Sequence, residues 1–232
     1  DWWEDHLFLK AAFPVDVTAD KATYEIPFAA IQRSTRRETL AEKAKFEVPA
    51  LRWADLSDAR GGVSLLNDCK YGHDIHGNVM RLSLLRSPTW PDPMADRGAH
   101  EFTYSLYTHR GGWNDDDTVR RGAELNTPLL ALVTDPERGT EPAESGFLDV
   151  AGDGVILETV KPAESGDGLI LRLYESKGRA VSATLRLHRA PSAVVATDLM
   201  ENPAGVIPSS GVNVSLQFAK FEIKTIRVSF NK

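Results

Sequence analysis

The sequence has a single cysteine, Cys69, in 232 residues, which excludes an internal disulfide framework and fits a reducing compartment. It also has little positive charge: it contains 27 Lys and Arg residues and 33 Asp and Glu residues, which gives a net charge of −6. Nucleic acids and anionic membranes both require a basic footprint, so neither is expected as a main partner. Only RSTRR at 33–37 is locally basic. No apolar run approaches the ~20 residues of a membrane span, and we expect a cytoplasmic protein.

Helical patterns are scarce as well. Apolar and polar residues alternate with a period of two in several runs, for example at 181–188 and 212–218, and most of the 13 prolines and 17 glycines lie between such runs. One short helix or an ordered loop is predicted within 115–126. The last run, 221–230, changes phase between Ile223 and Ile226, which predicts a β-bulge. The pattern as a whole predicts an all-β chain.

The domain organisation is indicated by two turn-rich segments, 136–147 and 161–168, each of which contains PAESG. After the second segment come four regular alternating strands, whereas the strands before it are longer and are separated by loops rich in aromatic and charged residues. We therefore expect a larger β domain over 1–160 and a small β-sandwich over 161–232.

The first residues, DWWEDHLFLKAAFPV, are unusually aromatic and apolar for a chain terminus. This suggests a cut made inside a longer protein. Trp2, Trp3 and Phe8 are expected to form a poorly paired edge or an exposed apolar patch that tends to self-associate, so a homo-oligomer is an open alternative.

The segment 67–78 concentrates side chains that bind metals, namely Asp68, Cys69, His73, Asp74 and His76. A catalytic zinc takes three protein ligands and a water. On a strand, however, His73 and His76 point to opposite faces, so the favoured interpretation is a polar strand–turn–strand with capping side chains. Cys69 has no local base and is expected to be buried and inert.

Carboxylates and tryptophans next to loops are the other candidates for function. A glycosidase needs two carboxylates about the scissile bond, and Asp92 with Asp96, or those at 115–117, could supply them or could simply cap turns. Trp53, Trp90 and Trp113 could stack on a sugar or on another domain, and for Trp53 a place in the core or an interface is favoured. Trp90 lies between Pro88 and Pro91 in SPTWPDP, and it is the best candidate to stack on a sugar because the prolines stiffen its loop.

Two long strings carry a family resemblance: IPFAAIQRSTRRETLAEKAKFEVPALRWADLSD (26–58) and NDCKYGHDIHGNVMRLSLLRSPTWPDP (67–93). They resemble the C-terminal β region of family-38 glycoside hydrolases, the retaining α-mannosidases, and most of all the cytosolic and bacterial branch. The resemblance covers nearly the whole chain. It implies a galactose mutarotase-like β supersandwich, truncated at its N-terminal side, followed by a small C-terminal β-sandwich.

The resemblance also implies where the chemistry lies. In the family, zinc holds sugar hydroxyls and an aspartate nucleophile forms a glycosyl–enzyme intermediate, but these residues belong to an N-terminal α/β barrel and a helical domain. Those domains would be the partners of this chain, alongside a mannoside substrate. No catalytic residue, zinc ligand or cofactor is therefore assigned here, and the chain by itself is expected to be inactive.

Within the β region of the family, a strand-end arginine and an Asp-containing loop help to close the substrate pocket. The matching positions are Arg86, at the end of VMRLSLLR, and Asp92; with Trp90 they are the expected substrate-binding residues. Here Arg-Ser and Pro-Asp-Pro stand where secreted relatives have paired arginines and paired aspartates. The alternative for Arg86 is a surface salt bridge to Asp92 or Asp96.

Two other functions are compatible with the same pattern. A free-standing carbohydrate-binding module would explain the aromatic loops. An aldose epimerase-like enzyme would share the fold, but it requires a histidine acid and a carboxylate base that face one cleft.

Overall fold

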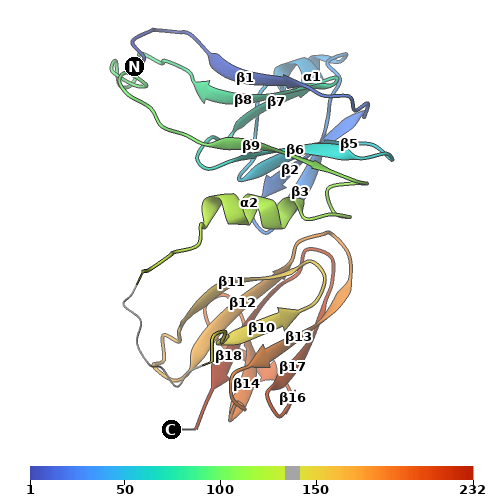
Figure 1. Cartoon of the computed structure of the whole chain (residues 1–232), viewed down its shortest axis with the longest axis vertical. Helices are drawn as coiled ribbons and strands as arrows, with labels where there is room; N and C mark the ends of the chain where they lie inside the picture. The colour runs from blue at the N-terminus through green and yellow to red at the C-terminus, as the bar shows by residue number, and fades with distance from the viewer. Residues whose placement is uncertain (134–141, 232) are drawn as a thin grey trace. The chain divides into compact units, whose positions relative to one another are not determined.

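The computed structural model describes residues 1–133 and 142–231, which form two compact units, Asp1–Leu130 and Ala131–Lys232. The regular structure of the described residues is almost entirely β, with two short helices among strands β1 to β18 (Figure 1). The predicted all-β chain that ends in a small β-sandwich is confirmed.

The first unit contains two antiparallel sheets. One has the order β1-β8-β7-β4 and the other the order β3-β2-β5-β6-β9. The strands of the first sheet are Leu9–Pro14 (β1), Val79–Leu85 (β8), Gly72–His76 (β7) and Val48–Pro49 (β4). Those of the second are Ala29–Ser34 (β3), Lys21–Ile26 (β2), Trp53–Ser57 (β5), Gly62–Asn67 (β6) and Tyr104–His109 (β9).

The core of this unit receives apolar side chains from both sheets. Leu56 and Leu65 come from the second sheet, and Met80 and Leu82 from the first; all four are fully buried. Burial of each such side chain contributes about 1.5–3 kcal/mol. The alternation along β8 holds from Met80 to Leu82 and breaks at the end of that strand, where the pairing with β1 shifts between Leu9 and Lys10 and Leu85 is buried.

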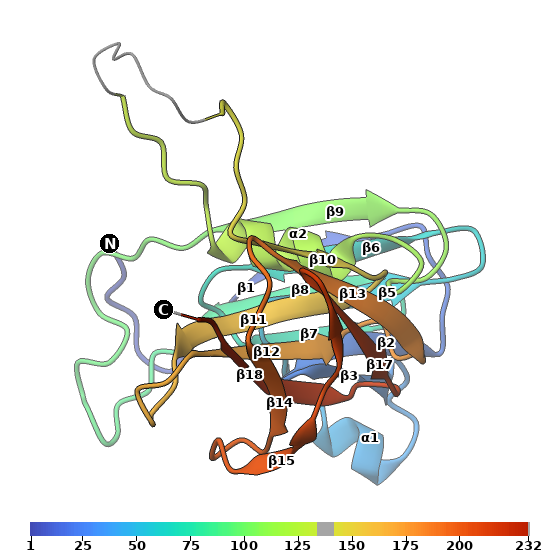
Figure 2. The ribbon, with the colours of Figure 1, turned by 90° about the horizontal axis from the view of Figure 1, so that it is seen from below.

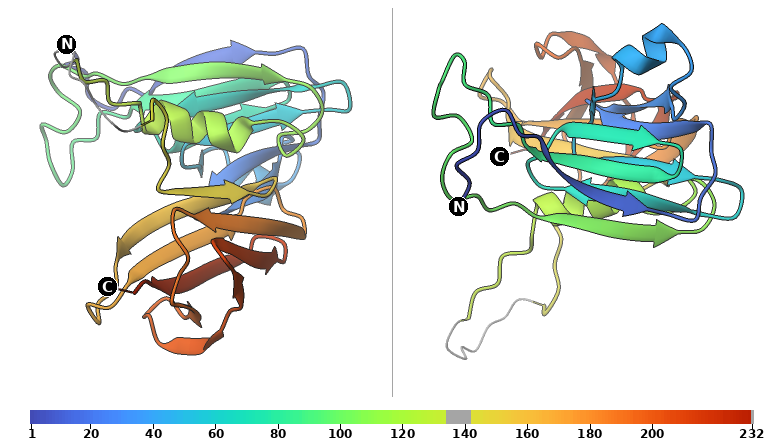
Figure 3. Two further views of the ribbon diagram at one scale, coloured as in Figure 1. Left: turned by 60° about the horizontal axis from the view of Figure 1, so that its bottom comes forward. Right: turned by 90° about the horizontal axis from the view of Figure 1, so that it is seen from above.

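Helix α2 (Thr118–Asn126) confirms the helix predicted within 115–126, and it packs on β5, β6 and β9 (Figure 2). Gly122 permits this close approach, because a Cβ there would lie 3.1 Å from Trp53 Cδ1. Trp53 is buried and stacks on Trp113 with ring centroids 5.1 Å apart, so its predicted core position is confirmed. The five-residue helix α1 (Leu40–Ala44, blue in Figure 3) begins at a capping box formed by Thr39 and Glu42.

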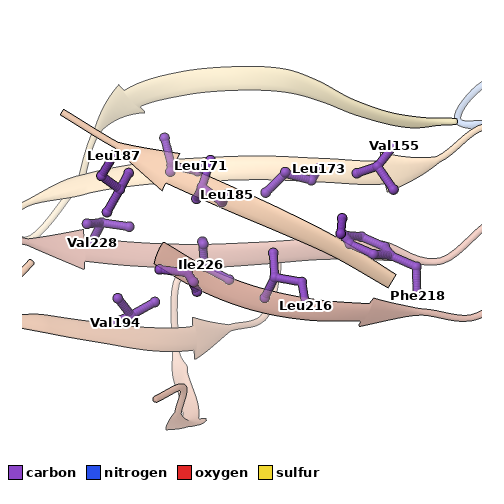
Figure 4. Packing of buried hydrophobic residues seen from close by; sticks show 12 residues of the cluster. Val155, Leu171, Leu173, Leu185, Leu187, Val194, Leu216, Phe218, Ile226 and Val228 are labelled. Atoms are coloured by element: carbon purple, nitrogen blue, oxygen red, sulfur yellow. The ribbon is translucent and has the colours of Figure 1, made fainter. Parts of the chain in front are cut away.

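The second unit is a two-sheet sandwich. One sheet, of order β10-β13-β17-β16, consists of Leu148–Ala151, Val181–Leu187, Asn213–Phe218 and Ser209–Ser210. The other, of order β11-β12-β18-β14-β15, consists of Val155–Pro162, Leu169–Glu175, Ile223–Ser229, Ala193–Thr197 and Pro203–Val206. The buried cluster between them includes Leu171, Leu185, Leu216 and Ile226 (Figure 4).

The predicted domain boundary at 160–161 is corrected by this topology. It falls inside β11, which pairs with β12, and β10 also belongs to the sandwich through β13. The units divide between Leu130 and Ala131 instead. The turn-rich segment 136–147 lies nearer to this division, although its residues up to 141 lie outside the described part of the chain.

The predicted β-bulge in the last strand is also wrong. The pairing of β18 with β12 runs without a shift from Ile223 to Val228. The change of phase arises because Thr225 and Ile226 are both buried, on opposite faces of the strand. Ile226 packs in the core, whereas the Thr225 hydroxyl accepts a hydrogen bond from Arg172 Nε at 3.2 Å.

Candidate functional site

The predicted site begins where β8 ends, at Leu85. The carboxylate of Asp96 accepts the backbone N–H groups of Arg86, at 2.8 Å, and of Ser87, at 2.9 Å. These two hydrogen bonds hold the pKa of Asp96 below its usual value. The loop that follows β8 is thus closed at its base by its own carboxylate, and the backbone of Arg86 is fixed.

Ser87 links this loop to the N-terminal segment. Its side chain is fully buried; its hydroxyl accepts a hydrogen bond from Trp2 Nε1 at 2.6 Å and donates to the Leu7 carbonyl at 3.1 Å. Trp2 and Gly98 also exchange two backbone hydrogen bonds of 2.8 Å. The positive φ of Ser87 (54°), unusual for a residue with a side chain, is held by these contacts.

A hollow of about 440 Å³ lies beside the end of β8, and we call it the Arg86 hollow. Half-exposed Phe8 and Phe46 border it, and Arg86, Glu47 and Asp96 supply its charged groups. The aromatic rings offer apolar surface next to hydrogen-bonding groups of both signs. This is the combination that a polar, ring-shaped ligand such as a sugar requires.

Glu47 is fixed in the hollow by its neighbours. Its carboxylate accepts hydrogen bonds from Lys10 Nζ at 2.5 Å and from the Ser83 hydroxyl. Only glycine fits at position 72, because a Cβ there would lie 2.6 Å from Glu47 Oε1 and 2.9 Å from Ser83 Cβ. Lys10 Nζ also lies 4.4 Å from the centre of the Phe8 ring. The carboxylate is therefore held in one place and neutralised by an ammonium group.

The guanidinium of Arg86 is exposed and forms no ion pair within residues 1–133 and 142–231. The alternative, a surface salt bridge from Arg86 to Asp92 or Asp96, does not form, because Asp96 binds the backbone and Asp92 Oδ1 accepts the N–H of Met94 at 2.8 Å. The five N–H donors of the Arg86 guanidinium remain available to a ligand.

Trp90 and Asp92 do not line the Arg86 hollow. Trp90 lies on the outer part of the loop with 83% of its surface exposed, next to the cis Trp90–Pro91 peptide. Their predicted role in substrate binding stays a prediction. The sequence analysis missed Phe46 and Glu47, whose only signal was an aromatic–carboxylate pair directly before the two-residue strand β4.

The histidine-rich segment is not a metal centre in the part of the chain that the structure describes, where no three His, Cys, Asp or Glu side chains are grouped to hold an ion. His73 is fully buried, and Asp74 is surrounded by cations instead. These residues do not fit a zinc site. Cys69 is exposed, so the prediction that it is buried is wrong; it lies in a bend that follows the end of β6.

A buried histidine–carboxylate pair was not predicted. His109 Nε2 lies 2.6 Å from Asp55 Oδ2, and neither side chain is exposed. Burial lowers the pKa of His109, but the hydrogen bond and charge of Asp55, with the Arg110 backbone and the charge of Asp116, outweigh it, so the net shift is upward. Asp55 also accepts hydrogen bonds from Ser57 and Ser64. The pair is sealed in the unit and does not present an acid and a base to a cleft, as an epimerase would require.

Replacement of Asp96 by alanine tests the base of the loop. It leaves the N–H groups of Arg86 and Ser87 without their acceptor. We therefore expect the first unit to lose about 1–2 kcal/mol of unfolding free energy. This is the lower part of the range for charge-assisted hydrogen bonds, because water reaches the site. Urea unfolding followed by tryptophan fluorescence measures this, since all five tryptophans lie in that unit. Glu101→Ala, at an exposed position, is the control; equal losses in both variants would contradict the expectation.

Comparisons with known proteins agree with this fold. Residues 1–94 match the profile described as Glycosyl hydrolases family 38 C-terminal domain, and residues 154–226 match Glycosyl hydrolases family 38 C-terminal beta sandwich domain. The chain belongs to this family, as its C-terminal β region. No helix in the described residues is long and apolar enough to cross a membrane.

Similar proteins include Alpha-mannosidase 2C1 of Homo sapiens, 43% identical over 97% of this chain and 22% of that protein. Alpha-mannosidase G of Dictyostelium discoideum is 35% identical over the whole chain and 22% of its own length. The crystal structure of an alpha-mannosidase from Enterococcus faecalis V583 shares the fold, with a TM-score of 0.80 over 97% of this chain and 26% of that one at 17% identity. The chain thus spans about a fifth of the curated relatives it matches.

Proposed function

We propose that this chain is the C-terminal β region of a retaining, zinc-dependent α-mannosidase and that it helps to form the substrate pocket through Arg86. The observation that carries the proposal is the similarity over 97% of the chain to proteins named alpha-mannosidase, at up to 43% identity. The nucleophile, the acid/base residue and the zinc ligands would lie in the other domains of the intact enzyme, as the family resemblance implies.

The Arg86 hollow supports a role in binding rather than in bond cleavage. Retaining glycosidases place two carboxyl groups about 5–5.5 Å apart across the scissile bond. Glu47 is instead tied to Lys10 and Ser83, and Asp96 to backbone N–H groups. Both carboxylates are therefore committed to holding the site. Arg86 is left to donate hydrogen bonds to sugar hydroxyls or to a carboxylate, with Phe8 and Phe46 against the apolar face of a ring.

An assay of the isolated chain tests whether bond cleavage requires the other domains. We expect the pure 232-residue chain to show no turnover of an aryl α-mannoside, with or without added zinc, because none of its residues is assigned to bond cleavage. A chromogenic assay at high enzyme concentration measures this. Turnover that co-purifies with the chain and survives a second purification would contradict the proposal.

A carbohydrate-binding module is the second candidate, and the exposed rings of Trp90, Phe8 and Phe46 favour it. Such a module would bind mannosides as the isolated chain, with changes in tryptophan fluorescence if Trp90 takes part. The α-mannosidase proposal expects the isolated chain to bind mannose weakly, since most of the pocket would come from other domains.

A further inference from the structure

A second pocket, of about 310 Å³, lies in the first unit away from the Arg86 hollow, and we call it the arginine pocket. It is lined by Arg33, Arg36, Arg37 and Lys45, with Glu42 and Asp74 as its carboxylates, and Tyr24 and His73 are among its other lining residues. Three of the four cations come from RSTRR, the one locally basic segment of a chain whose net charge is −6. Four cations against two carboxylates give the pocket a positive charge.

The two carboxylates are already engaged by their neighbours. Asp74 has Lys10 Nζ at 3.4 Å and Arg81 Nη1 at 3.6 Å, and Arg37 also pairs with it. Glu42 accepts the N–H groups of Glu38 and Thr39 in the capping box, and these bonds with the Ser34 hydroxyl lower its pKa to about 2. Neither carboxylate is a free partner for the remaining cations of the pocket.

Arg36 pairs with Asp20, which leaves Arg33 and Lys45 as the pocket cations without a carboxylate in the described residues. The Arg33 guanidinium lies over the ring of Tyr24, 4.7 Å from the ring centre, and its Nη1 is buried with no hydrogen-bond acceptor in the described residues. A buried donor without a partner costs free energy. Lys45, an exposed residue at the end of α1, forms no ion pair in that part of the chain. Two positive charges therefore lack a counter-charge from the protein.

His73 lies at the back of the pocket and is fully buried. Its Nδ1 is 3.4 Å from the Tyr71 carbonyl oxygen, an acceptor, so this nitrogen carries the proton of the neutral ring. Its Nε2 is then an acceptor, and no donor meets it in the described residues. The pocket thus lacks an acceptor for Arg33 and a hydroxyl-type donor for His73.

We propose that the arginine pocket binds a phosphate-bearing small molecule about the size of a monosaccharide. Guanidinium groups match phosphate oxygens in two-pronged hydrogen bonds, and Arg33 with Lys45 would neutralise the charge. The hydroxyl groups of such a ligand supply the donors that His73 Nε2 lacks. The volume lies at the lower end for ligand pockets, which suits a single phosphorylated sugar. This site is independent of the mannosidase proposal, since none of its four cations lines the Arg86 hollow.

Calorimetric titration of the 232-residue chain tests the proposal with three probes at constant ionic strength: glucose 6-phosphate, inorganic phosphate and glucose. We expect saturable binding of glucose 6-phosphate and no binding of glucose. Weaker binding of inorganic phosphate would show that the sugar contributes. Equal binding of the two phosphates would also support the site and would assign it to the phosphate group alone.

Two variants locate the binding. Arg33→Leu should raise the Kd for glucose 6-phosphate at least about tenfold, and Lys45→Met, at an exposed position that the fold does not need, about threefold. Arg120→Gln, on the exposed face of α2, is the matched loss of one charge and should leave the Kd unchanged. No saturable binding of either phosphate, or equal weakening in Arg120→Gln and Lys45→Met, would overturn the proposal.

Discussion

Replacement of Arg86 by alanine in the intact enzyme is expected to lower kcat/KM for an α-mannoside by one to three powers of ten. Each power of ten corresponds to about 1.4 kcal/mol of lost transition-state stabilisation. The backbone of Arg86 is anchored by Asp96, whereas its guanidinium meets no protein partner in the described residues, so the side chain is free to act on a ligand. Steady-state kinetics with an aryl α-mannoside measures the effect.

The same variant should hardly change stability. The exposed Arg86 side chain makes no contact that folding depends on, so the urea midpoint of the first unit should stay within the range of a surface substitution, about 0.5 kcal/mol. Arg120→Ala, also exposed, is the kinetic control and should leave kcat/KM unchanged. If Arg86→Ala kept full turnover but lowered the melting temperature by several degrees, Arg86 would be structural.

His73 should make the stability of the first unit depend on pH. Burial lowers its pKa from 6.5 to about 4; the Tyr71 carbonyl opposes this shift, and the charge of Arg33 adds to it. The folded state therefore binds fewer protons than the unfolded state between these two values. The stabilisation is complete above pH 6.5 and is lost as the pH falls toward 4, by roughly 3 kcal/mol.

A comparison with His73→Gln isolates this effect. Glutamine does not titrate, whereas the carboxylates titrate alike in both chains. The difference in unfolding free energy between wild type and His73→Gln should therefore shrink by roughly 3 kcal/mol from pH 6.5 to 4. Tryptophan fluorescence reports the first unit alone. His76→Gln, at an exposed position, should show no such change. A constant difference between wild type and His73→Gln over this range would show that His73 is protonated at its ordinary pKa in the fold.

The sequence predicted the features that depend on local pattern. Alternation predicted the strands and the all-β class, and the short helix predicted within 115–126 is α2. Period-two pattern identifies only the face that a residue occupies, which is why the two-sided burial of Thr225 and Ile226 was taken for a bulge. The boundary was misplaced because β10 and β11 pair with strands that come after the predicted seam.

Of the residues that line the Arg86 hollow, the sequence placed only Arg86 in the expected site, because it directly follows a strand. Arg86 is the first residue after β8, so it emerges where the strand ends; the period-two pattern alone would place it on the core face with Met80 and Leu82, and a register shift near Leu85 breaks that pattern. Phe46 and Glu47 reach the same hollow from the residues directly before β4, a strand of two residues whose pairing with β7 leaves no periodic signal. The His109–Asp55 pair joins residues that are distant in sequence through β6, and sequence spacing does not indicate it.

The most direct test of the central claim is turnover of an aryl α-mannoside by the full product of the gene that encodes this chain, measured with the β region present and after its removal. The account predicts hydrolysis of the α-mannoside by the full product and loss of that activity without residues 1–232. A full product that does not hydrolyse α-mannosides, or one whose kcat/KM is unchanged when this region is removed, would contradict it.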